Sequence, residues 1–139
     1  MNLDGVAKLR PYAPREPIHY ELMTDQEIFE GAGGTLVVDT ESYPNYFLIA
    51  FKDLKTGKVI IFENQIHDPR KLVWIMQSYR TVGFNSNKYD IPLIWLYHAG
   101  CDVKTLKEAS NQLIFNNIFP QALQTEFNFK IHKTNHIDL

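Results

Sequence analysis

Apolar residues gather in short runs that predict β-strands. The run T-L-V-V-D-T-E at 35–41 is apolar or β-branched almost throughout, which is typical of a strand buried on both faces. A second strand is expected at 46–54 and a third at 59–62, joined by a hairpin turn in K-T-G-K. A short fourth strand is expected at 81–84, and H-I-D-L at 136–139 begins a last one.

Apolar residues spaced by three and four predict helices between these strands. An amphipathic helix is expected at 69–80, where Asp68 precedes a proline at the first helical position. Its apolar face consists of Leu72, Ile75, Met76 and Tyr79. Two more helices are expected at 91–99, ending before a glycine, and at 103–115. Residues 116–133 are interpreted as one further helical segment and a loop.

The N-terminal region has a different character from the rest of the chain. The segment P-Y-A-P-R-E-P places three prolines at three-residue spacing, which disfavours helix and sheet and indicates an extended arm. The capping-box pattern T-D-Q-E then predicts a short helix, which G-A-G-G ends. We therefore divide the chain into an arm with a short helix at 1–34 and a folded domain at 35–139.

Three meandering strands followed by alternating strands and helices predict the α/β fold class, with a mixed β-sheet and helices packed on it. The chain is 45% apolar and 13% aromatic, which is enough for one packed core. Its net charge of −2 provides no general attraction for nucleic acid. A nucleic-acid enzyme of this composition therefore needs bound metal ions and local lysines.

Features of the whole chain also bear on its location. The only cysteine, Cys101, excludes an intramolecular disulfide. The N-terminus lacks the apolar segment of a signal peptide, and no apolar stretch approaches the ~18 residues of a membrane span. We therefore expect a cytoplasmic protein, of a bacterium or a phage-infected host, with no membrane partner.

The strongest candidates for chemistry are the two acids of D-T-E. Side chains alternate between the faces of a strand, so Asp39 and Glu41 point the same way, roughly 6–7 Å apart along the chain. Two ionised carboxylates so placed are costly without a cation between them, and hard oxygen ligands favour Mg²⁺ or Mn²⁺. A third acid, Asp90, ends N-S-N-K-Y-D at the start of the next helix.

Plainer interpretations of the same residues remain open at this point. An Asp-x-Glu at a strand end is often a solvated turn. Asp90 is a good helix N-cap, and Asn85 is an ordinary loop former. Aromatic residues such as Phe84, Trp95 and Tyr97 more often fill a core than stack on bases.

Taken together, D-T-E after an apolar strand and G-F-N-S-N-K-Y-D-I-P resemble the first two motifs of DEDD-superfamily 3′–5′ exonuclease domains. The closest likeness is to the proofreading exonuclease of family B DNA polymerases, in which a strand resembling H-I-D-L also follows the second motif. The resemblance covers about 35–139. It implies a ribonuclease H-like fold that hydrolyses phosphodiester bonds at the 3′ end of single-stranded DNA.

By position, the resemblance implies that Asp39, Glu41 and Asp90 are catalytic and bind two Mg²⁺ or Mn²⁺ ions. Asp39 would bridge both ions, Glu41 would hold the ion beside the attacking water, and Asp90 would reach the other. The residues it places against nucleic acid are Thr40, Asn85 and Tyr89.

The family's third motif has no counterpart in this sequence. That motif carries a fourth carboxylate preceded by Tyr or His, whereas Asp138 has Thr134 and Lys133 at the corresponding places. We therefore expect an exonuclease domain incomplete at its C-terminus, whose partner is a polymerase domain or the missing part of the domain. Two other interpretations stay open: an inactive ribonuclease H-like module that binds nucleic acid or protein, and a scaffold whose proline-rich arm makes the interaction.

Overall fold

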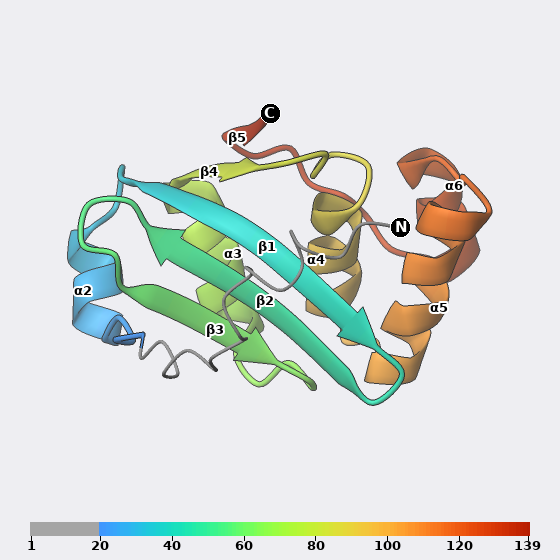
Figure 1. Cartoon of the computed structure of the whole chain (residues 1–139), viewed down its shortest axis with the longest axis horizontal. Helices are drawn as coiled ribbons and strands as arrows, with labels where there is room; N and C mark the ends of the chain where they lie inside the picture. Colours follow the sequence, from blue (N-terminus) through green and yellow to red (C-terminus); the bar gives the residue numbers. More distant parts are fainter. Residues whose placement is uncertain (1–19) are drawn as a thin grey trace, which may run out of the picture.

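Five strands of the described residues form one mixed sheet in the order β3-β2-β1-β4-β5 (Figure 1). Three successive strands, β1 (Thr35–Tyr43), β2 (Tyr46–Asp53) and β3 (Val59–Glu63), pair antiparallel. On the other side of β1, β4 (Arg80–Gly83) pairs parallel with β1, and β5 (His136–Asp138) pairs parallel with β4. The sheet is therefore antiparallel on one side of β1 and parallel on the other.

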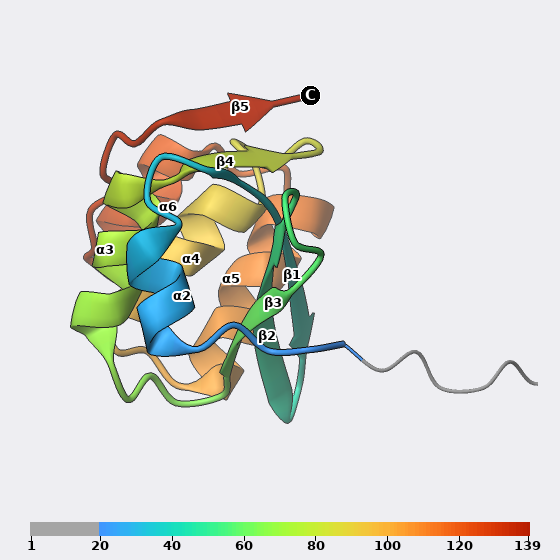
Figure 2. The same ribbon diagram turned by 90° about the vertical axis from the view of Figure 1, so that its left-hand side faces the viewer.

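Helices cover one side of this sheet. They are α2 (Asp25–Glu30), α3 (Pro69–Ser78), α4 (Asp90–His98), α5 (Val103–Phe115) and α6 (Pro120–Phe127). Figure 2 shows them together on the same side of β1, β2 and β3. The predicted fold class, an α/β arrangement with a mixed sheet and packed helices, is confirmed, and it is compatible with a ribonuclease H-like fold.

This computed structural model describes residues 20–139. The predicted proline-rich arm lies outside these residues, so the division of the chain near residue 34 stays a prediction. In the part of the chain that is described, no helix has the length and apolar character needed to cross a membrane.

Side-chain caps fix the starts of α2 and α3. The Thr24 hydroxyl accepts from the Glu27 amide while the Glu27 carboxylate accepts from the Thr24 amide, which is the predicted capping box. Asp68 accepts from the Lys71 amide at 3.1 Å, with proline at the first helical position. The helix that follows ends at Ser78, two residues earlier than predicted, because Tyr79 already has extended backbone.

The prediction that the first strand is buried on both faces is wrong. Along β1 buried residues alternate with half-buried and exposed ones, and the exposed positions from Asp39 onward include Glu41 and Tyr43. The physical reason is the one-sided placement of the helices, which leaves the other face of β1 to solvent (Figure 2). The two acids of D-T-E therefore lie on the open face.

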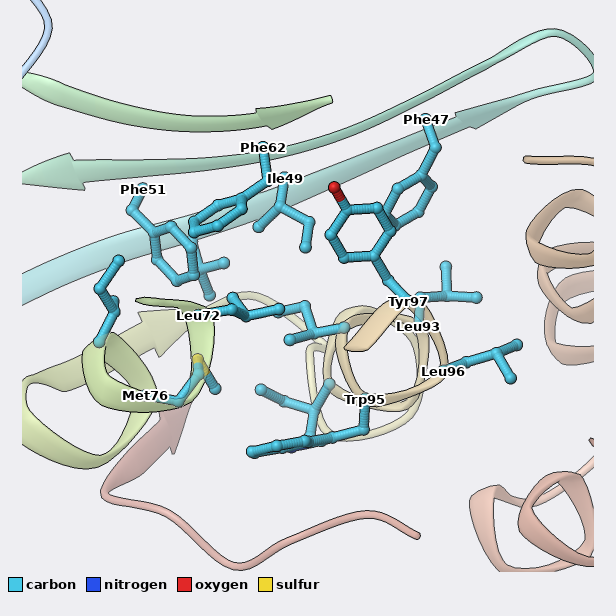
Figure 3. Packing of buried hydrophobic residues seen from close by; sticks show 14 of the residues in the cluster. Phe47, Ile49, Phe51, Phe62, Leu72, Met76, Leu93, Trp95, Leu96 and Tyr97 are labelled. Carbon is cyan, nitrogen blue, oxygen red and sulfur yellow. The ribbon is translucent and has the colours of Figure 1, made fainter. Parts of the chain in front are cut away.

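The core lies between the sheet and the helices and centres on α4. All but the last residue of α4 is buried, so apolar side chains surround this helix on every side. Phe47 of β2 packs on Tyr97 with ring centroids 5.1 Å apart, and Leu93 and Trp95 are equally enclosed (Figure 3). The plainer interpretation as core residues is thus confirmed for Trp95 and Tyr97, but it is wrong for Phe84, which is 72% exposed. A helix held this firmly fixes the position of its first residue, Asp90.

Candidate functional site

The candidate site forms where β1 extends beyond β4. The parallel pairing of these strands ends at Val37 and Val82, and β4 stops at Gly83, whereas β1 continues to Tyr43. Past that point the edge of β1 faces the start of α4. The Thr40 N–H on this edge donates to carboxylate oxygens in place of a strand carbonyl.

Asp39 and Asp90 meet at this one backbone amide. Thr40 N–H donates to Asp39 Oδ1 at 3.0 Å and to Asp90 Oδ1 at 3.1 Å, and the Thr40 hydroxyl donates to the same Asp90 oxygen. Two acids fifty-one positions apart are thereby brought together. Asp90 is only 5% exposed, while Asp39 faces solvent on the open side of the sheet.

The surroundings of Asp90 disfavour its negative charge. Burial above all, together with the neighbouring charge of Asp39, raises the pKa of its carboxyl to about 6 against the opposing hydrogen bonds from Thr40. A carboxyl in this state gains most from a cation that neutralises it together with its neighbour. The pair therefore has the electrostatic character of a cation site.

Glu41 lies two residues further along the same exposed face of β1. Its Oε2 accepts a hydrogen bond from the Tyr43 hydroxyl at 2.8 Å, and this bond raises the pKa of Tyr43. Glu41 is thus on the predicted side of the strand, at the rim of the site. Nearby, Lys107 of α5 donates to the Ser42 carbonyl at 3.2 Å, which puts one positive charge at the end of β1.

Tyr89 stands between the acids and α5. Its hydroxyl shares a 2.7 Å hydrogen bond with Ser110, and burial raises its pKa, with the three nearby carboxylates raising it further. The phenol therefore keeps its proton beside the acids. Ser110 itself was not anticipated, although a fully buried serine among the apolar positions of α5 is the sort of signal that points to a polar partner.

The structure also places Asp90, Thr40 and Asn85, three residues for which the sequence suggested a role. Asp90 does not cap α4: Tyr89 occupies the N-cap position, and the Asp90 side chain is engaged by Thr40 instead. Thr40 is buried on the inner face, so its hydroxyl serves Asp90. Asn85 is exposed and has left-handed backbone, with a φ of 51°.

Metal-ligand geometry is incomplete within residues 20–139, where no group of three or more His, Cys, Asp or Glu side chains is arranged to hold a metal ion. Mg²⁺ commonly takes only one or two protein carboxylates and fills its remaining positions with water and substrate phosphate. The Asp39–Asp90 pair, with Glu41 at its rim, has the oxygen donors for that mode of binding.

Gly83 is the last residue of β4, where the loop that leads to Asp90 begins. Its replacement tests how closely that loop packs. A Cβ added at Gly83 would lie 2.7 Å from both Cβ and Oγ of Ser86. Gly83→Ala is therefore expected to destabilise the protein by roughly 1–3 kcal/mol, measured by urea denaturation. The cost should shrink when Ser86→Gly is also present, and equal costs in both backgrounds would contradict the contact.

Comparison of the chain with protein-family models, curated proteins and solved structures gave no match.

Proposed function

We propose that the protein is a metal-dependent 3′–5′ exonuclease domain of the proofreading type, acting on the 3′ ends of single-stranded DNA. The observation that supports this most is the meeting of Asp39 and Asp90 at the Thr40 amide. These are the first and third acids of the two motifs whose resemblance suggested the activity. Unrelated surface acids have no reason to share a hydrogen-bond donor across fifty residues.

In this proposal the side chains have separate tasks. Asp39 and Asp90 would hold one Mg²⁺ or Mn²⁺, and Asp39 with Glu41 would hold a second. When bound, such ions would activate a water and neutralise charge on the leaving 3′ oxygen. Thr40 keeps Asp90 in place from the inner face of β1, and Tyr89, protonated beside the acids, is available to contact the substrate strand with Asn85.

The resemblance also implies a fourth carboxylate, which is not found beside Asp39 and Asp90 within residues 20–139. We propose that it comes from a partner, either a polymerase domain or a further segment of the exonuclease. Until it is supplied, substrate phosphate and water would complete the coordination of a bound ion.

The test is digestion of a 5′-labelled single-stranded oligonucleotide. With Mn²⁺ the protein is expected to shorten it stepwise from the 3′ end, and EDTA should stop the reaction. Asp39→Ala should reduce the rate to the EDTA background because it removes the carboxylate common to both ions. Asp102→Ala is the matched control, since this exposed acid only caps α5.

Two outcomes would contradict the proposal. Shortening that persists in Asp39→Ala would mean that the activity belongs to a contaminant or another site. Binding of the oligonucleotide without shortening, unaffected by Mn²⁺, would favour the inactive binding module.

A further inference from the structure

The strand β5 contacts the loop before Asp90 through both ring nitrogens of one histidine. His136 Nδ1 lies 2.7 Å from Thr81 Oγ1, and His136 Nε2 lies 2.6 Å from Ser86 Oγ. Both hydroxyls belong to fully buried residues. Because a hydroxyl can donate or accept, the neutral imidazole is satisfied on both sides in either tautomer. The histidine thereby joins β4 to the loop at residues 84–89.

Asp138, two residues further, holds the same loop through its backbone. Its Oδ2 accepts from the Asn87 N–H at 3.0 Å, and this bond, with the neighbouring amides of Ser86 and Asn85, keeps the pKa of Asp138 below its ordinary value. The left-handed backbone of Asn85 is the kind of turn that directs successive N–H groups toward one anion. The loop therefore forms an anion-binding turn, and Asp138 occupies it.

The held loop is directly connected to the candidate site. The Ser86 carbonyl accepts from the Tyr89 amide at 3.3 Å and from the Ile91 amide at 2.9 Å, so Ser86 is bonded to the first turn of α4. Asp90 lies between Tyr89 and Ile91 in the sequence, and its carboxylate accepts from the Thr40 amide. A continuous path of hydrogen bonds thus runs from His136 through Ser86 to the turn that carries Asp90.

We propose that His136 and Asp138 are positioning residues that hold the 84–89 loop so that the Asp90 carboxylate meets Thr40 and Asp39. The part of this proposal that concerns metal binding rests on the proposed function; the part that concerns the placement of Asp90 does not. The strand that carries both residues has only three positions, so its side chains supply much of its attachment. The hydrogen bonds of both side chains go to Thr81, Ser86 and Asn87 and not to the acids.

Hydrogen exchange of the Thr40 amide, followed by NMR without metal, tests the placement of Asp90. His136→Leu keeps an apolar side chain of similar size but cannot bond to either hydroxyl. We expect exchange at Thr40 to become about tenfold faster, because its amide keeps only the exposed Asp39 as a partner. Exchange at Ile49 and Phe51 of β2 should change much less, whereas a merely structural loss would accelerate all of these amides together.

Three further variants separate a positioning role of His136 from a general loss of structure. His132→Leu changes a histidine that packs on Trp95 in the same connection and should leave Thr40 unchanged. His136→Gln keeps a donor and an acceptor and should restore part of the protection. If His136→Leu does not fold, Asp138→Asn removes the charge from the loop with little change of shape and should also accelerate Thr40. The proposal would be overturned if exchange at Thr40 accelerated only as much as exchange at the β2 amides. It would also be overturned if His132→Leu accelerated Thr40 as much as His136→Leu does.

Titration of the same proteins with Mn²⁺ links placement to the site. His136→Leu should weaken Mn²⁺ binding at least about tenfold, as expected for residues that orient a ligand without touching the ion. Equal affinity in His136→Leu and the unchanged protein would overturn the link to metal binding. If the unchanged protein binds no Mn²⁺, the proposed function fails, while the exchange measurement still decides the positioning role.

Discussion

Asp90→Asn is expected to make the metal-free protein more stable above pH 6 and to remove its response to Mn²⁺. The buried Asp90 carboxylate lies beside Asp39 without a cation, so its ionised form is costly in the folded state. Asparagine keeps an oxygen for the Thr40 amide and hydroxyl and carries no charge. The substitution therefore removes the electrostatic cost and retains the hydrogen bonds.

The pH dependence of this gain follows from the raised pKa. Between the ordinary value of 3.8 and the folded value of about 6, the folded protein binds more protons at Asp90 than the unfolded chain does. The free energy of unfolding contributed by this group therefore falls as the pH rises through that window, and the full penalty is present above pH 6. About two pKa units correspond to roughly 3 kcal/mol, which is the upper limit of the expected gain.

Urea denaturation in EDTA at several pH values checks this prediction. The difference between Asp90→Asn and the unchanged protein should be small below pH 4 and grow up to pH 6. Asp102→Asn is the control. The hydrogen bonds of its helix cap lower the pKa of Asp102, so the change in the free energy of unfolding with pH should have the opposite sign for this variant. A constant offset at all pH values would contradict the argument. With Mn²⁺ at pH 7 the unchanged protein and Asp102→Asn should gain thermal stability, whereas Asp90→Asn, which lacks the full carboxylate pair, should not.

Phe47→Ala is expected to cost 3–5 kcal/mol, about what a large buried aromatic costs when truncated. Phe47 is fully buried at the start of β2 and packs on Tyr97 of α4, so its loss leaves a cavity between the sheet and the central helix (Figure 3). The thermal midpoint should fall by roughly 10 °C or more.

Phe115→Ala is the matched control for this substitution. Phe115 has the same side chain at the end of α5 but is 76% exposed, so its truncation should change stability by less than about 0.5 kcal/mol. Similar losses in the two variants would contradict the assignment of Phe47 to the core. Calorimetry or thermal melting followed by circular dichroism measures both.

The hydrophobic pattern was sufficient to predict most of the elements and the fold class. Capping residues such as Thr24 and Asp68 act locally, so helix starts could be predicted to within a residue. The burial of β1 could not be predicted, because an apolar run has the same appearance whether one face of the strand or both are covered. Which faces the helices cover depends on contacts between segments far apart in the sequence.

The candidate site was predictable in part for the same reason. The alternation of strand side chains placed Asp39 and Glu41 on one face, as the structure shows. The approach of Asp90 depends on the register of β4 against β1, in which Val82 pairs with Val37 and β4 ends while β1 continues, and the sequence pattern does not specify that register. The roles of Ser86 and His136 likewise require the parallel neighbour β5.

The enclosure of α4 has a consequence for genetic screens of this protein. The helix that carries Asp90 is also the one packed on every side, so replacements at Leu93, Ile94 or Leu96 are expected to displace Asp90 together with the helix. A collection of inactive mutants will therefore include many such interior positions alongside the acids. Sorting the two groups requires a measurement of folding for each mutant, because only the acid replacements should lose activity in a protein that melts normally.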